Sequence, residues 1–348
     1  MNPSTTLTYS IVIATRNRSE ALKLSLPRML AQNRPPQQII IIDSSDDLSA
    51  SCIVAKEILG STTIDWRLES SERGTTKQRN LGLSYSTHPV TMLPDDDAIW
   101  FPNTAEEMMT VYERDTSQQV SAVCAAESFI PPIDFHTSRR VGYSMRSTDR
   151  LRLRSMRLRR WFENRFFPDP GRLVGQSFIS SFSKPGWFAE HGVVPVDYMT
   201  GFRMSFRTAV LRKTGFDLHF TNYAIFDDID ASFGAWKSGA VVAATKAKVY
   251  HHRSPERRLG GWHIGARQLL DKAYVVAKHT PIGSSGRACM RRFALYKVAG
   301  YLLSWHSSHG RSRFLGAKAA LRELPSILRA QPDTVAAAYT EAVSRCAA

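Results

Sequence analysis

The first third of the chain alternates short apolar runs with stretches whose apolar residues have helical spacing. The apolar runs predict buried strands, at Tyr9–Ala14, Ile39–Ile42, Thr63–Leu68, Val90–Leu93 and Val120–Ala126. The stretches between them predict helices, at Ser19–Leu30, Asp47–Leu59, Thr75–Tyr85 and Asn103–Arg114. Strands that alternate with helices in this way form βαβ units with parallel pairing. We therefore predict an α/β fold with a Rossmann-like, mostly parallel sheet flanked by helices.

The pattern along the whole sequence divides the chain into four parts. Residues 1–134 hold the alternating segment. Residues 135–195 are rich in Arg, Phe, Gly and Pro without a clean period, and we interpret them as a basic insertion. Regular spacing returns in residues 196–260, and residues 261–348 are predicted to be mostly amphipathic helix. The fold is thus expected to carry an insertion and a C-terminal helical extension.

Charge is distributed in blocks along the chain, whose formal net charge is +15. Residues 1–136 contain 11 Lys and Arg against 17 Asp and Glu. Residues 137–165 contain 10 against 2, and residues 248–330 contain 16 against 3. An evenly basic protein would suggest nucleic acid as the partner. This pattern instead predicts an acidic catalytic half with basic flanks that face an anionic surface or anionic substrate groups.

Membrane spanning, secretion and cysteine chemistry are not expected from the sequence. The longest apolar stretch without charge, Val298–Gly310, is shorter than the roughly 18 residues that a spanning helix needs. Residues 1–8 lack the basic start of a secretory signal, so we expect a cytosolic protein. The four cysteines are scattered without Cys-x-x-Cys spacing, which is typical of reduced thiols.

Three adjacent carboxylates, Asp95, Asp96 and Asp97, directly follow the predicted strand Val90–Leu93. Carboxylates this close repel one another, so a fold that keeps them at a strand end is expected to place positive charge there. A divalent cation such as Mg²⁺ or Mn²⁺ suits them, because these ions are held by one or two carboxylates and substrate phosphates. The alternative is a solvated turn in which the aspartates cap the next helix.

Polar residues follow three of the predicted strands. They are Thr15 to Asn17 after the first strand, Asp43 to Ser45 after the second and Asp95 to Asp97 after the fourth. Ligands of open α/β sheets bind beyond the carboxyl ends of the strands, so we expect these side chains to converge. The segment at Asp43 has the alternative role of a helix cap. Its carboxylate is equally suited to accept a hydrogen bond from a nucleobase N–H group.

A basic segment, ERGTTKQRNLG at residues 72–82, precedes the aspartate strand and contains Arg73, Lys77 and Arg79. Basic helix faces are common for solubility alone. Beside an acidic site, these residues are also suited to hold a base or a diphosphate and to balance the carboxylates. The sequence has no Gly-x-Gly-x-x-Gly after the first strand and no P-loop motif. Ordinary dinucleotide and P-loop nucleotide binding are therefore disfavoured.

A second acidic cluster, FDDID at residues 226–230, opens a helix predicted to run to about Gly239. Acids in a first helical turn commonly complement the helix dipole and need no further role. Alternatively, a helix start that faces a site can present one carboxylate, such as Asp228, as a general base. The strand that follows leads into His251 and His252. A histidine there is either structural or a ligand suited to Mn²⁺.

Seven segments together resemble the family 2 glycosyltransferases with the GT-A fold, bacterial enzymes that use a nucleotide-sugar donor. They are SIVIATRNR (10–18), IIIIDSSDD (39–47), RGTTKQRNLG (73–82), LPDDDAIWFP (93–102), TGFRMSFR (200–207), FDDID (226–230) and VYHH (249–252). The segments occur in the family's order over about 245 residues. The resemblance makes residues 1–134 the nucleotide-sugar-binding subdomain and residues 196–260 the acceptor and catalytic subdomain.

The resemblance also implies roles for individual residues. It implies a donor-binding set made of Thr15, Asn17, Asp43, Arg73, Arg79, Asn80, Asp95 and Asp96. It implies that the metal ion, Mg²⁺ or Mn²⁺, is held by Asp97 with Asp95 and His251. Gly201 falls on the acceptor side, and Asp228 looks like the catalytic base. The family's more usual Glu-Asp at the base is Asp-Asp here, which leaves Asp227 as the alternative base.

The activity that the resemblance implies is that of an inverting hexosyltransferase in bacterial surface polysaccharide synthesis. The donor is expected to be a UDP-, TDP- or GDP-linked sugar and the acceptor a glycan or a lipid diphosphate. We expect a cytoplasmic protein, and a peripheral position on the inner face of the cytoplasmic membrane is a further hypothesis. It rests on the basic blocks, whose cations attract anionic lipids. The alternative for these blocks is a helical bundle with solvated basic faces.

Two other classes of protein remain as alternatives. A nucleotidyltransferase would also use aspartates on a nucleotide-binding sheet, but the sequence lacks a glycine- and lysine-rich loop near the first strand. A nucleic-acid-binding protein would explain the arginines but not the acidic clusters at strand ends. We therefore expect no nucleic acid as partner.

Overall fold

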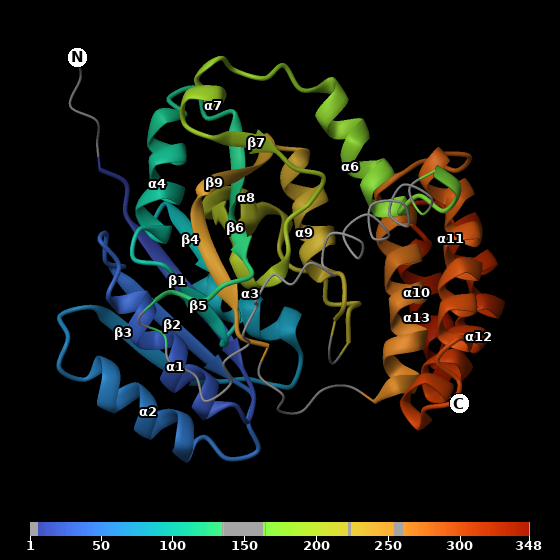
Figure 1. The fold of residues 1–348 in the computed structure, drawn as a ribbon, viewed down its shortest axis with the longest axis horizontal. Coiled ribbons are helices and arrows are strands. Elements are labelled where there is room, and N and C mark those ends of the chain that lie inside the picture. The colour runs from blue at the N-terminus through green and yellow to red at the C-terminus, as the bar shows by residue number, and fades with distance from the viewer. Residues whose placement is uncertain are drawn as a thin grey trace, which may run out of the picture. The chain divides into compact units, whose positions relative to one another are not determined.

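The computed structural model describes residues 6–133, 135, 163, 165–221, 224–253 and 260–347 (Figure 1). The chain divides into two compact units, which are described separately below. The first comprises Met1–Pro132 with Gly175–Leu259, and the second comprises Ile133–Val174 with Gly260–Ala348. Of the helices in the described ranges, none combines the length and the apolar character needed to cross a membrane.

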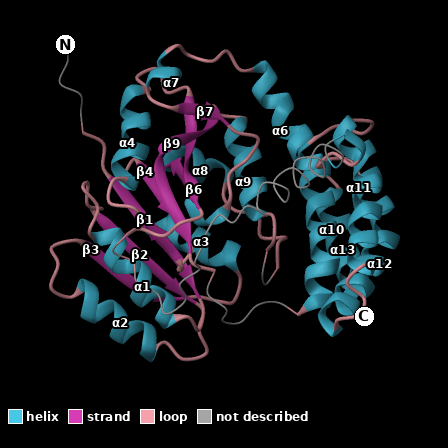
Figure 2. Cartoon of the chain, viewed as in Figure 1, coloured by secondary structure: helices cyan, strands magenta, loops and turns pink. Residues whose placement is uncertain are grey.

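The first unit is built on a sheet of nine strands (Figure 2). The strands are β1 (Tyr9–Thr15), β2 (Gln38–Asp43), β3 (Asp65–Ser70), β4 (Val90–Leu93), β5 (Ala98–Trp100), β6 (Val120–Ser128), β7 (Val193–Pro195), β8 (Met204–Arg207) and β9 (Ala240–His251). Their order is β3-β2-β1-β4-β8-β6-β9-β5, and β7 also pairs with β9. The pairs β3-β2, β2-β1, β1-β4 and β6-β9 are parallel, whereas β8, β5 and β7 run against their neighbours. The predicted α/β fold with a mostly parallel sheet is confirmed.

The centre of this sheet is buried, since β1, β2 and β4 are covered along nearly their whole length. Continuous runs of Ile and Val are typical of parallel strands that are covered on both faces. The register pairs Thr15 with Asp43, and an isolated bridge joins Ala14 to Asp95. The polar residues that follow β1, β2 and β4 therefore reach the same edge of the sheet.

Five helices of the first unit begin within two residues of their predicted starts: α1 (Ser19–Leu30), α2 (Ser49–Leu59), α3 (Thr75–Tyr85), α4 (Thr104–Arg114) and α9 (Asp227–Trp236). The described part of this unit also contains α7 (Trp187–Glu190), the short 3-10 turn η1 (Gly201–Arg203) and α8 (Thr208–Thr214). Helix α6 (Pro170–Ser181) spans the boundary between the two units. Residues 136–162 and 164 of the predicted basic insertion (135–195) lie outside the described residues.

Helix α3 packs directly on the centre of the sheet, and Gly82 makes this close approach possible. A Cβ atom at Gly82 would overlap Cγ1 of Val12 on β1 and would lie 3.3 Å from Cγ1 of Ile42 on β2. Gln78, one turn earlier, donates through Nε2 to the carbonyl oxygens of Thr15 at 2.7 Å and Ile42 at 2.8 Å. The helix thereby fixes the carboxyl ends of β1 and β2.

Among its described residues, the second unit contains four long helices, α10 (Gly261–His279), α11 (Ser285–Leu302), α12 (Ser308–Arg329) and α13 (Val335–Ala347). Its core includes the stacked rings of Tyr274 and Tyr339, whose centroids are 4.3 Å apart. Beside them, the Tyr339 hydroxyl donates to Asp271 at 2.8 Å, and Arg267 pairs with the same carboxylate at 2.8 Å. The predicted C-terminal helical extension is confirmed.

We predict that Gly82→Ala lowers the free energy of unfolding by about 1 to 3 kcal/mol, because the added methyl group overpacks the contact with β1. The measurement is urea denaturation followed by circular dichroism. Gly300→Ala in α11 is the matched control, since a Cβ atom there meets nothing within 4 Å. That change should be neutral or stabilising, because Ala favours a helix over Gly by up to about 1 kcal/mol. Equal effects of the two changes would contradict the packing argument.

Candidate active site

The polar residues at the carboxyl ends of the strands form one connected group. Thr15 at the end of β1 donates through Oγ1 to Oδ2 of Asp96 at 2.7 Å. The backbone N–H of Ser44, after β2, donates to the carbonyl oxygen of Thr15 at 3.1 Å. The convergence expected from the strand order is thus present in the structure.

Two of the three adjacent aspartates are held by one arginine. Asp96 and Asp97 are buried, whereas Asp95 is half-buried. Arg18, which lies just before α1, places Nη1 at 2.7 Å from Oδ1 of Asp96 and Nη2 at 2.6 Å from Oδ2 of Asp97. A bidentate guanidinium of this kind compensates two buried negative charges that would otherwise repel each other.

His251 joins the aspartates because β5 pairs with the end of β9 and sets Ala98 opposite His251. Its Nε2 lies 3.3 Å from Oδ1 of Asp97, and its ring stacks on Phe202 with a centroid distance of 4.4 Å. One ligand atom from each of Asp95, Asp97 and His251 lies within 4.8 Å of the others. Two carboxylates and an imidazole suit Mn²⁺ or Mg²⁺ with open positions left for other ligands. The residues present therefore fit a divalent metal.

The surroundings shift the aspartate pKa values in opposite directions. Burial is the largest influence on the pKa of Asp96 and raises it to about 8, against the opposing charge of Arg18. Burial also raises the pKa of Asp95, and Arg79 opposes the shift. Burial opposes ionisation of Asp97 as well, but His251 and Arg18 outweigh it and lower its pKa. Asp97 is therefore the member of the cluster that stays ionised most readily.

A second arginine, Arg79 of α3, connects the aspartate cluster to α9. It is 5% exposed, and its Nη1 lies 2.6 Å from Oδ2 of Asp227 while Nη2 lies 3.1 Å from Oδ1 of Asp95. The ring of Phe216 lies 5.4 Å from its guanidinium carbon. The carboxylate of Asp227 is therefore held in a buried ion pair, which fixes the start of α9.

Asp228, the next residue, points to a different set of partners. Its Oδ2 accepts a hydrogen bond from the N–H of Gly201 at 2.9 Å, and its Oδ1 accepts one from the N–H of Ile229 at 2.8 Å. Burial and the neighbouring charge of Asp227 raise the pKa of Asp228 to about 7, against the opposing charge of Arg79. A carboxyl group with such a pKa is suited to accept a proton near neutral pH.

Gly201 in η1 marks the point where these groups meet. A Cβ atom placed there would lie 3.1 Å from Nη2 of Arg79, 3.7 Å from Oδ1 of Asp95 and 3.8 Å from Oδ2 of Asp228. The metal-ligand cluster and the raised-pKa carboxyl group therefore border the same small region.

The residues expected near a nucleobase lie at the ends of β1 and β2. Asp43 is buried, and its Oδ1 accepts from the N–H of Ser45 at 2.7 Å, whereas its Oδ2 has no hydrogen-bond partner among the described residues. Asn17 has a positive φ of 54°, and its side chain exchanges hydrogen bonds with Asp46 at 2.8 and 3.1 Å. Arg73 is exposed just before α3.

The side chain of Asn80, which was named in the donor-binding set, is hydrogen-bonded to backbone groups. Its Nδ2 donates to the carbonyl oxygen of Phe216 at 2.8 Å, and its Oδ1 accepts from the N–H of the same residue at 2.8 Å. Asn80 thus ties α3 to the segment after α8 and positions its neighbour Arg79.

Sequence reasoning missed three residues that shape this site, namely Arg18, Gln78 and Phe202. Arg18 and Gln78 lie inside the motif segments at residues 10–18 and 73–82, beside residues that were singled out. The signal for Arg18 was its place after the first strand, on the same sheet edge as Asp95 to Asp97. Nothing in the sequence marks Phe202 as the ring on which His251 stacks.

The comparison with protein families found a match to the model described as "Glycosyl transferase family 2" over residues 10–179. Over this span the chain is similar to glycosyl transferase family 2. The match includes β1 to β6, Arg18, Arg79 and the three adjacent aspartates. The comparison with curated proteins found no match.

Among solved structures, this glycosyltransferase is similar to the mannosyltransferase PcManGT from Pyrobaculum calidifontis, determined in complex with GDP-Man and Mn²⁺. The TM-score is 0.52 at 12% sequence identity, and the match covers 99% of this chain and 88% of the other. The likeness shows a common GT-A fold. The family and the fold are those of glycosyltransferases.

We predict that Arg18→Ala lowers the free energy of unfolding of this glycosyltransferase by about 3 kcal/mol, because it leaves Asp96 and Asp97 buried without their counter-charge. The measurement is chemical denaturation without and with Mn²⁺, and the ion should stabilise the variant more than the parent. Arg16→Ala is the control, since Arg16 pairs with Asp46, whose side chain is 65% exposed, and such pairs contribute about 1 kcal/mol or less. Similar losses in the two variants would contradict the role given to Arg18.

Proposed function

We propose that this chain is a metal-dependent, inverting glycosyltransferase of the hexosyltransferase type. It moves a sugar from a nucleoside-diphosphate donor to a hydroxyl group of a glycan or lipid-linked acceptor. One observation supports this above the others: the cluster of Asp95, Asp97 and His251 and the carboxyl group of Asp228 border the same region beside Gly201. A donor's diphosphate and an acceptor's hydroxyl group need these two kinds of residue close together.

The metal-ligand cluster supplies the donor side of the proposal. The similar mannosyltransferase was determined with GDP-Man and Mn²⁺, which supports a nucleotide sugar as donor and a divalent ion as cofactor. Asp97, Asp95 and His251 would hold the ion. When bound, such an ion acts as a Lewis acid that stabilises the negative charge of a departing diphosphate. His251 is held for this task by its stacking on Phe202.

The nucleoside end of the donor is assigned to the ends of β1 and β2. Asp43 Oδ2 is a buried acceptor without a partner among the described residues, and a nucleobase N–H group would satisfy it. Arg73 lies just before α3, the helix that carries Arg79, and is exposed, so it is available to a base or a phosphate. Asn17 acts on this side through Asp46 and the backbone.

Asp228 is the better candidate for the general base than Asp227. Oδ2 of Asp227 lies 2.6 Å from Nη1 of Arg79, so this carboxylate is already engaged in a buried ion pair. Asp228 has a pKa raised to about 7 and a partly exposed side chain. It takes the proton of the acceptor hydroxyl group as that oxygen attacks the anomeric carbon. Attack from the face opposite the leaving diphosphate inverts the configuration in a single displacement.

The family resemblance and the charge distribution support the acceptor and the pathway that we propose. We place the reaction in bacterial surface polysaccharide synthesis, on the cytoplasmic side of the membrane. The basic C-terminal helices support an acceptor that carries phosphate, such as a lipid diphosphate, because Lys and Arg bind phosphate groups. Gly201 belongs to the acceptor side of this proposal, and a Cβ atom there would lie 3.8 Å from Oδ2 of Asp228.

We predict that a donor nucleotide sugar raises the melting temperature of the protein only when Mn²⁺ or Mg²⁺ is present. A thermal-shift screen of UDP-, TDP- and GDP-sugars, with and without each ion, measures this, since a ligand of the folded state raises its apparent stability. Asp97→Ala should abolish the ion-dependent shift, and Glu57→Ala, at an exposed carboxylate on α2, should retain it. An equal shift without any divalent ion would contradict the metal assignment.

We predict that Asp228→Asn lowers kcat by about 10²- to 10⁴-fold while the donor-induced thermal shift remains, because only the base is removed. In the parent, activity should rise as the pH increases through about 7, where Asp228 loses its proton. A carboxyl group whose folded-state pKa is raised destabilises the fold as the pH rises above its unfolded value of about 4. The variant should therefore melt higher than the parent at pH 8 and equally at low pH. A fully active Asp228→Asn enzyme would contradict the assignment.

A further inference from the structure

Helices α11 and α12 and the turn between them expose large apolar side chains. They lie on α11, on α12 and in the turn between them: Leu295 is 59% exposed, Leu302 51%, Leu303 84%, Trp305 41% and Leu315 47%. Trp305 is held by an edge contact with Phe314, with ring centroids 5.3 Å apart. Apolar side chains gathered on one surface mark a site of interaction with a protein or a membrane.

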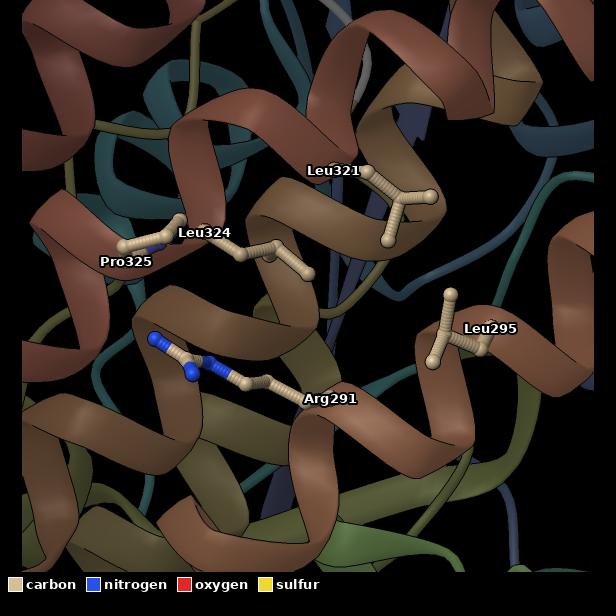
Figure 3. A pocket seen from close by; sticks show the side chains of 5 residues that line it. All are labelled: Arg291, Leu295, Leu321, Leu324 and Pro325. Atoms are coloured by element: carbon tan, nitrogen blue, oxygen red, sulfur yellow. The ribbon is translucent and has the colours of Figure 1, made fainter.

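A shallow apolar groove continues this surface between α11 and α12 (Figure 3). Its volume is about 220 Å³, and its lining is Arg291 and Leu295 from α11 with Leu321, Leu324 and Pro325 from α12. Arg291 is exposed at its edge, so the groove presents a cation beside an apolar floor.

The segment of the chain that carries this surface is basic. Residues 272–322 contain ten Lys and Arg and no Asp or Glu. On α12, Arg311, Lys318 and Arg322 are exposed at helical spacing together with Leu315. None of these three, nor Arg291, has an ion pair with a carboxylate in the part of the chain that the structure describes.

From these observations we infer that the α11–α12 surface docks on an anionic phospholipid bilayer. The surface consists of Leu295, Leu302, Leu303, Trp305 and Leu315 with Arg291, Arg311, Lys318 and Arg322. The leucines and the tryptophan enter the headgroup boundary, and the cations attract the lipid phosphates. A second copy of this chain is disfavoured as the occupant, because pairing the surface with itself would bring like charges together. The inference does not depend on the proposed reaction.

The test is flotation of the full chain with two kinds of vesicle, phosphatidylcholine alone and phosphatidylcholine with about one third phosphatidylglycerol. The protein should float with the anionic vesicles at low salt and much less at high salt, because salt screens the attraction. The double change Arg311→Gln and Lys318→Gln should weaken binding about fivefold for each charge removed. The double change Leu302→Ser and Leu303→Ser should weaken vesicle binding at low salt and abolish the residual vesicle binding at high salt.

The matched control variants change residues of the first unit, which are distant in sequence from α11 and α12. Lys23→Gln with Lys56→Gln removes two exposed cations, and Leu24→Ser with Ile53→Ser removes two exposed apolar side chains. The two test variants and the two control variants all change exposed side chains, and circular dichroism checks that each variant is folded. Equal binding to neutral and anionic vesicles, or equal loss in the control variants, would overturn the inference. So would light scattering that shows a dimer in the parent and a monomer in the Leu302 and Leu303 variant.

Discussion

The site of this glycosyltransferase depends on the compensation of buried negative charge. Asp96, Asp97 and Asp227 are buried, and carboxylates in such surroundings are stable only beside positive groups. Arg18 holds the first two and Arg79 holds the third, together with Asp95. Arg18 follows β1, and its ion pairs connect the end of β1 to the aspartates after β4. Arg79 lies on α3, and its ion pair with Asp227 connects α3 to α9. The same contacts that neutralise the site fix its geometry.

The strand ends could be predicted from sequence because their cause is local. Continuous apolar runs such as Ile39–Ile42 are typical of buried parallel strands, and polar residues after such runs reach one edge of the sheet. Antiparallel β8 between β4 and β6, and the three-residue strand β5, carry no comparable pattern. The pairing of β5 with β9 brings His251 beside Asp97. That contact is a product of tertiary packing, and only the family resemblance indicated it.

The pairing partners of charged residues were the least predictable feature of the site. Arg18 and Asp97 are 79 positions apart, and Arg79 and Asp227 are 148 apart. Nothing in the string DDID separates Asp227 from Asp228 chemically. The difference arises because one side chain meets the guanidinium of Arg79 and the other meets the N–H of Gly201. Environment therefore separates two identical neighbours into a structural acid and a candidate base.

Charge balance also explains why donor and metal binding should be linked in the proposed reaction. The site contains five carboxyl groups, Asp95, Asp96, Asp97, Asp227 and Asp228, against the two guanidinium groups of Arg18 and Arg79 and the imidazole of His251. A diphosphate brings further negative charge into this region, and like charges disfavour its approach. A divalent ion at Asp97 offsets two of these negative charges. Each ligand then raises the affinity of the other by the same factor, because such coupling is reciprocal.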